Sequence, residues 1–137
     1  MKCPLALGAI GAVALLSACQ SDAEQQADAV EDRIETQADA SAAAAGAAPA
    51  LLGLTERQLL DADLVAADGS DLGDIEQIRR GTNGAVDGLL VEIEDSNPDR
   101  YVVVPVIGLK TRVDGDDTDV ETSMTAADLA ALPDAAM

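Results

Sequence analysis

Histidine, tryptophan and phenylalanine are missing from this 137-residue chain, and Tyr101 is its only aromatic residue. Without histidine, a serine or cysteine nucleophile lacks the imidazole that most often acts as its general base. The core must be built from aliphatic side chains, and a Val, Leu or Ile contributes only about 1.5–3 kcal/mol when fully buried. We therefore expect a small domain of modest stability and no nucleophilic catalytic residues.

Cysteine is almost absent as well. Cys3 and Cys19 are the only two, and both lie at the extreme N-terminus. The body of the chain therefore has neither a disulfide framework nor a thiolate metal site. Its fold must be held by packing alone.

Basic residues are few, with 8 Lys and Arg against 26 Asp and Glu, for a net charge of −18. Binding to nucleic acid requires a basic surface that releases counterions from phosphates, and this charge excludes such a surface. A bare anionic membrane surface is excluded for the same reason. The chain also has no glycine-rich phosphate loop, so we expect no cofactor and no small-molecule substrate.

The N-terminus has the features of an export signal. Lys2 precedes an apolar run over residues 4–18, which is shorter than the roughly 20 residues that a membrane-spanning helix needs. The run ends in Leu16-Ser17-Ala18-Cys19, which resembles the lipobox of bacterial lipoproteins. The resemblance implies that residues 1–18 are removed and that Cys19 carries the lipid; the alternative is an ordinary signal peptide with an incidental cysteine. Gln20, in place of Asp, resembles the sorting signal for the outer membrane, facing the periplasm.

Residues 19–53 have a low-complexity composition, acidic and Gln-rich at first and then almost entirely small residues. A weak apolar spacing at Ala23, Ala27, Val30 and Ile34 is typical of a helical stripe or a short coiled coil. Like charges four residues apart, such as Glu31 and Glu35, oppose a helix. We expect a disordered or partly helical tether that holds the following domain away from the membrane.

Residues 54–137 show a different pattern, with short apolar runs separated by tight turns. Thr55 and Thr125 each begin a capping-box pattern for a short helix, and Asn83-Gly84 is a hairpin signal. Gly73 interrupts the alternation of its strand and predicts a bulge. The expected strands are residues 64–66, 72–78, 89–93, 101–106 and 109–113 with a weak one at Val120. Such a set of strands predicts a mainly β domain, either a small barrel or an open sheet.

Four segments of this domain, in order, resemble the PRC-barrel family. They are the Asp-Gly hairpin of VAADGSDLGDIEQI, the turn and strand of GAVDGLLVEI, the Val-Pro strand end of YVVVPV, and the closing helix of TAADLAALP. The resemblance covers residues 60–133 and implies a small β-barrel of about six short strands with short flanking helices. It implies no catalytic residues, because the family shares no catalytic motif.

A few side chains are candidates for chemistry or contact. Carboxylates at alternating positions are a weak candidate for a Ca²⁺ site, although they lack the loop of an EF-hand and are also typical of a solvated turn. These are Asp114, Asp116, Asp117 and Asp119. Arg79, Arg80 and Tyr101 are candidate contacts with a protein partner, or else structural residues of the domain.

Other acidic residues have plain surface interpretations. Glu92 and Glu94 share one strand face, as an acid–base pair would, but a solvated face accounts for them equally. The Asp residues between positions 61 and 74 are read as turn and surface residues.

These observations predict a lipid-anchored, non-catalytic adaptor in the cell envelope that binds a protein partner. The alternatives are an envelope enzyme that uses carboxylates alone and a Ca²⁺-responsive sensor.

Overall fold

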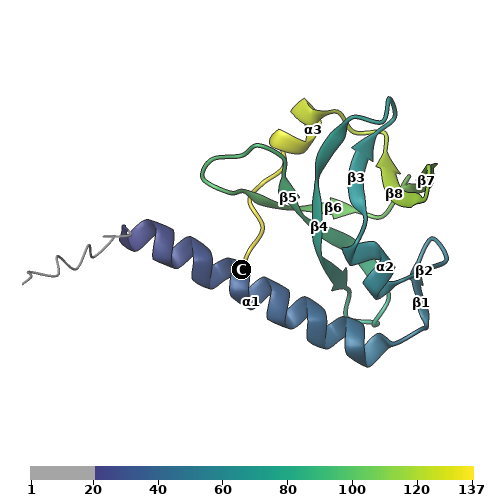
Figure 1. Cartoon of the computed structure of the whole chain (residues 1–137), viewed down its shortest axis with the longest axis horizontal. Coiled ribbons are helices and arrows are strands. Elements are labelled where there is room, and N and C mark those ends of the chain that lie inside the picture. The colour runs from purple at the N-terminus through teal and green to yellow at the C-terminus, as the bar shows by residue number, and fades with distance from the viewer. Residues whose placement is uncertain (1–20) are drawn as a thin grey trace, which may run out of the picture.

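A computed structural model describes residues 21–137 of the chain. The expected signal peptide, the lipobox with Cys19, and Gln20 lie outside these residues. In the described part, one long helix lies along one side of a curved β-sheet, and two short helices accompany the sheet (Figure 1). No helix in this part has both the length and the apolar character that crossing a membrane requires.

The long helix α1 (Asp22–Ala45) occupies most of the segment that the sequence suggested as a disordered or partly helical tether. Its start is fixed by a capping box in which the Ser21 side chain and the Glu24 carboxylate each satisfy a backbone N–H. Ile34, Ala38 and Ala42 lie on one face and are buried. The helical part of this segment is therefore continuous and packs against the domain, and its small alanines allow a close approach.

Six strands form a single sheet in the order β6-β5-β4-β3-β8-β7. All neighbouring strands are antiparallel except β3 and β8, which are parallel. The strands are β3 (Asp63–Ala66), β4 (Asp71–Arg80), β5 (Val86–Ile93), β6 (Tyr101–Pro105), β7 (Lys110–Asp114) and β8 (Asp117–Thr122). The predicted mainly β class and the six predicted strands are thus confirmed.

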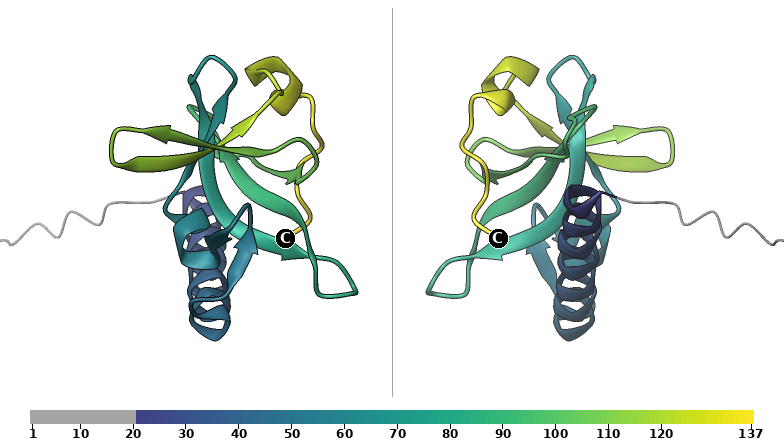
Figure 2. Two further views of the ribbon diagram at one scale, coloured as in Figure 1. Left: turned by 90° about the vertical axis from the view of Figure 1, so that its right-hand side faces the viewer. Right: turned by 90° about the vertical axis from the view of Figure 1, so that its left-hand side faces the viewer.

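The sheet does not close into a barrel in the described residues, which differs from the PRC-type barrel that the sequence suggested. β6 and β7 are its two edges and do not pair with each other. The outer edge of β6 is occupied by the C-terminal segment, where Val102 bridges Asp134 and the Ala135 N–H donates to the Tyr101 carbonyl at 2.7 Å. Figure 2 shows the strong curvature of the sheet and the β7–β8 hairpin that projects from it.

The short elements are largely as the sequence predicts. Thr55 caps α2 (Glu56–Leu60) and Thr125 caps α3 (Ala126–Ala130), each with a complete capping box. The hairpin turn with Asn83 and Gly84 joins β4 to β5, with Gly84 at a φ of 79°. A further hairpin, β1 (Pro49–Leu51) with β2 (Leu54–Thr55), was not expected.

The bulge predicted at Gly73 is present. Leu64 pairs with Gly73 while Val65 pairs with Asp71, so the register shifts at this point. A methyl group on Gly73 would overlap the carbonyl oxygen of Glu92 on β5. Only glycine lets the two backbones approach this closely.

The main core lies on one face of the sheet, under α2 and α3. It consists of Leu59, Ala62, Leu64, Leu72, Ile75, Ile78, Leu89, Val91, Val102, Val104, Leu109, Val120 and Leu129. Leu90 is fully buried but is not part of this core, because it alternates with Leu89 and Val91 and faces the other side. Helix α1 covers that second face: Leu90 pairs with Gln77 of β4, whose side-chain amide donates to Gln37 of α1 at 3.2 Å.

Candidate acidic groove

Two adjoining hollows on the surface form what we call the acidic groove. The first has a volume of about 400 Å³ and the second about 650 Å³, and both are lined by Asp61 and Asp63. Ten carboxylate side chains line the two hollows: Glu35, Asp39, Asp61, Asp63, Asp74, Glu76, Asp114, Asp116, Asp117 and Asp119. Among the described lining residues, Arg57 is the only basic one.

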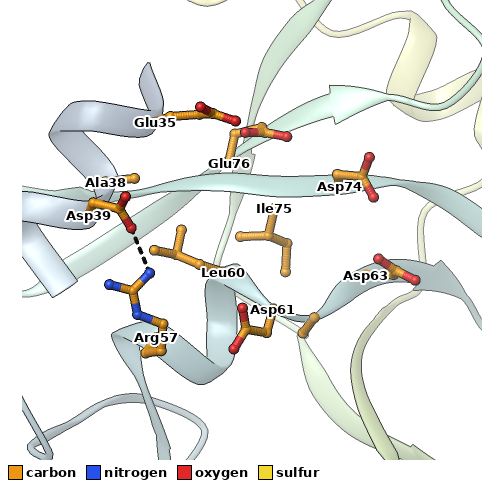
Figure 3. Close-up of a pocket in the computed structure, with 11 residues that line it drawn as sticks. Glu35, Ala38, Asp39, Arg57, Leu60, Asp61, Asp63, Asp74, Ile75 and Glu76 are labelled. Atoms are coloured by element: carbon orange, nitrogen blue, oxygen red, sulfur yellow. Dashed lines mark hydrogen bonds and ion pairs between the residues drawn. The ribbon is translucent and has the colours of Figure 1, made fainter. Parts of the chain in front are cut away.

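Four parts of the fold bring these carboxylates together. Helix α1 supplies Glu35 and Asp39, one turn apart, and strand β4 supplies Asp74 and Glu76 (Figure 3). The segment that leads from α2 into β3 supplies Asp61 and Asp63. The β7–β8 hairpin provides the remaining four. The groove therefore exists only because α1, the end of α2 and the hairpin meet beside strands β3 and β4.

Arg57 does little to neutralise the groove, because it already has a partner. Its Nη1 lies 2.6 Å from Oδ1 of Asp39, and the pair joins α2 to α1. This hydrogen bond, with the nearby charges of Asp39 and Asp61, raises the pKa of Arg57 above its ordinary value. The rest of the groove keeps a strong excess of negative charge.

Asp63 shows the effect of crowding among these carboxylates. It lies directly opposite Asp74 in the β3–β4 ladder. Burial raises the pKa of Asp63 to about 6, and the charges of Asp71, Asp74 and Asp119 add to the effect, as does a hydrogen bond with Asp74. Asp63 therefore keeps its proton up to a higher pH than an isolated aspartate does.

The pKa of Glu76 is higher than that of Asp63. It is half-buried on β4, and burial raises its pKa to about 7, with the charges of Glu92, Asp74, Glu35 and Glu31 acting in the same direction. Figure 3 shows the Glu35 and Glu76 side chains next to each other, one from α1 and one from β4. The helix and the sheet thus meet with like charges along their contact.

The suggested Ca²⁺ ligands line the second hollow of the groove. Asp114 and Asp117 pair at the end of the β7–β8 hairpin, around Gly115 with a φ of 62°. Within residues 21–137, no three Asp, Glu or Cys side chains converge as a metal ion would need. The hairpin geometry accounts for this Asp- and Gly-rich run.

The three candidate partner contacts do not line the acidic groove. Arg80 is paired with a buried carboxylate: its Nη2 lies 2.9 Å from Oε2 of Glu56, at the start of α2. Arg79, its neighbour, is half-buried, and its Nε has no hydrogen-bond partner. These contacts favour a structural role for Arg80.

Tyr101 lines a different and more apolar hollow of about 360 Å³, between the first half of α1 and the C-terminal segment. Ala27, Val30 and Met137 line it as well. The side chain of Tyr101 is half-buried and makes a hydrogen bond with Glu92. Burial and the nearby carboxylates, Glu92 first among them, raise the pKa of Tyr101.

Sequence reasoning did not find the acidic groove. In the sequence, Asp61, Asp63 and Asp74 were interpreted as separate turn and surface residues. Glu35 and Asp39 were assigned to the tether. The Ser21-x-x-Glu24 capping box is the local signal that would have indicated a fixed helix there. The convergence of helix, strand and hairpin is a tertiary feature that no local pattern contains.

No protein-family profile matches this chain, and no curated protein sequence matches it.

Proposed function

We propose that this chain is a lipid-anchored, non-catalytic adaptor of the bacterial cell envelope, and that its acidic groove binds a basic segment of a partner protein. The observation that carries the proposal is the groove itself, with ten carboxylates and one arginine that is already paired with Asp39. Lys and Arg side chains complement such a surface, and complementary charges speed encounter and select partners.

The anchor is supported by the sequence. The lipobox-like Leu16–Cys19 follows an apolar run of signal-peptide length, and several acyl chains at about 0.8 kcal/mol per methylene hold a protein firmly on a membrane. Cys19 stands two residues before Ser21, the N-cap of α1. Because α1 packs on the sheet, the helix itself sets how far the groove stands from the membrane. The Gln20 signal supports an outer-membrane position facing the periplasm.

The PRC-barrel assignment is part of this proposal. It is supported by the six strands at the expected places and by the capped helix α3 after them. The open edge between β6 and β7 is a departure from a closed barrel. In this proposal the curved sheet serves as a scaffold that presents the groove.

A second candidate function is favoured by one observation, the Asp63–Asp74 pair. Two neighbouring carboxylates, one of them with its pKa raised to about 6, are the minimum for acid–base catalysis. Both side chains, however, lie on the exposed surface of an open groove. A catalytic pair normally works in a site that excludes water, so we place the enzyme second.

Calorimetric titration of the full chain with a lysine decapeptide tests the adaptor proposal. We expect binding that weakens as salt is added, because screening acts on exposed charges. Asp61→Asn/Asp63→Asn removes the charges shared by both hollows and should weaken binding by about tenfold or more. Asp87→Asn/Glu94→Gln removes two charges outside the groove and should leave binding nearly unchanged. Equal losses in both double variants would show attraction to net charge alone and would contradict the proposal.

A further inference from the structure

The contact between α1 and the sheet combines close packing with like charges. Ile34, Ala38 and Ala42 are buried at intervals of four residues, and the Gln37–Gln77 hydrogen bond ties the helix to β4. Small side chains bring the helix axis near the sheet. The carboxylates on either side of this apolar stripe are therefore held closer together than a solvated tether would hold them.

Glu76 lies where these charges meet. The charges that act on Glu76 come from Glu31 and Glu35 of α1, Asp74 of its own strand and Glu92 of β5, and Glu76 in turn acts on Tyr101 of β6. Glu92 is itself affected: burial raises its pKa, and Asp99, Glu31 and Asp74 add to the effect, against the hydrogen bond with Tyr101. Ionising Glu76 therefore adds a negative charge to a partly desolvated contact that already carries several.

We propose that α1 docks on the sheet reversibly, and that protonation of Glu76 holds it down while ionisation of Glu76 releases it. The device is built into the fold, because the apolar part of the contact is small. Three residues, two of them alanines, supply the buried apolar surface of the helix. Because this contact is weak, one charge is enough to shift the equilibrium between the docked and the released helix.

The direction of the pH effect follows from linkage. The pKa of Glu76 is about 7 in the docked state, above the ordinary value of 4.5. The docked state therefore binds the proton more tightly, so docking is strongest below pH 4.5 and is lost as the pH rises through about 7. Within that window, each pH unit changes the ratio of docked to released helix by up to about tenfold.

The consequence for the acidic groove rests on the proposed function. Glu35 and Asp39 of α1 form one wall of the groove, so release of the helix removes that wall. A basic segment in the groove offsets the same charges that a proton on Glu76 offsets. Partner binding and protonation should therefore both favour the docked helix.

NMR of the full chain in detergent micelles tests the inference. Two readouts report docking. One is the contact between the side-chain amides of Gln37 and Gln77, and the other is the set of methyl signals of Ala38 and Ala42. We expect these contacts at about pH 5 and their loss by about pH 8, with the change falling between the ordinary pKa of 4.5 and the docked-state pKa of about 7, because the docked state binds the proton of Glu76 more tightly. Glu76→Gln should keep the helix docked throughout. Glu94→Gln, the same change in the turn that follows β5, should behave like the wild type.

A contact that persists unchanged from about pH 5 to about pH 8 in the wild-type chain would overturn the inference, and so would an unaltered transition in Glu76→Gln. Salt provides a second measurement that needs no variant, because added salt at about pH 8 should restore the contact by screening. The failure of this inference is separable from that of the proposed function. A lysine decapeptide that does not bind refutes the groove as a docking site, whereas a helix insensitive to pH and salt refutes the switch.

Discussion

Replacing Arg80 by alanine separates a structural role for this arginine from a role in partner binding. Arg80 donates to Oε2 of Glu56 at 2.9 Å and to the Gly84 carbonyl at 3.1 Å. Glu56 is only 1% exposed, whereas the Arg80 side chain is 38% exposed. The substitution would leave a buried carboxylate without its countercharge, at the start of a helix that packs on the core.

The size of the effect follows from this burial. Breaking a buried ion pair by removing one partner costs about 3–5 kcal/mol. Because Arg80 is partly exposed and water can replace some of its contacts, we expect about 2 kcal/mol. In a domain of this size, that corresponds to a fall in Tm of roughly 10 °C.

Thermal and urea unfolding of the full chain measure this loss, and Arg57→Ala is the matched control. Arg57 also pairs with a carboxylate, at 2.6 Å, but both side chains are exposed, so its loss should leave Tm close to that of the wild type. Glu56→Met/Arg80→Met should recover much of the lost stability, because no buried charge is left unpaired. Equal effects of Arg57→Ala and Arg80→Ala would refute the reasoning, and a stable Arg80→Ala chain that no longer binds its partner would assign Arg80 to the interface.

Four further predictions concern pH, Gly73, Cys19 and Ca²⁺. Lowering the pH from about 8 to about 5 should raise Tm in calorimetry, because the raised pKa values of Asp63 and Glu76, about 6 and about 7, mean that the folded state holds these protons more tightly. A Tm that falls over that range would contradict this. Gly73→Ala should cost about 2 kcal/mol or more in urea unfolding, because its methyl group meets the Glu92 carbonyl; an unchanged midpoint would show that the strands can separate there. Cys19→Ser should move the protein from the membrane to the soluble fraction on cell fractionation, and continued membrane attachment would exclude the lipid anchor. Titration with Ca²⁺ should give no heat of binding, and a saturable signal would favour the sensor alternative.

The strands could be predicted from the sequence because their signals are local. The alternation in residues 89–93, the Asn83-Gly84 turn and the capping box at Thr55 each act within a few residues. Each favours one conformation strongly, and the structure has that conformation. The bulge at Gly73 could be predicted for the same reason, since glycine is needed where two backbones approach closely.

The docking of helix α1 on the sheet and the acidic groove could not be predicted, because they depend on contacts between distant residues. Like charges four apart, as in Glu31 and Glu35, argued against a helix, while the burial of Ala38 and Ala42 that compensates for them appears only in the folded chain. An alanine in the sequence gives no signal that distinguishes a solvated tether from a helix packed against a sheet. The covering of the β6 edge has a similar origin, because the C-terminal segment that occupies it lies some thirty residues away in sequence.

Site-specific photo-crosslinking in intact cells tests most directly whether the groove is where a partner protein binds. The crosslinking residue is placed at Asp61, where the two hollows meet, or at Thr82, an exposed turn residue that lines neither. We predict a defined protein adduct from position 61 that a lysine decapeptide suppresses, and none from position 82. An adduct from position 82 alone, or one from position 61 that the peptide leaves unchanged, would contradict a groove that recognises a basic segment.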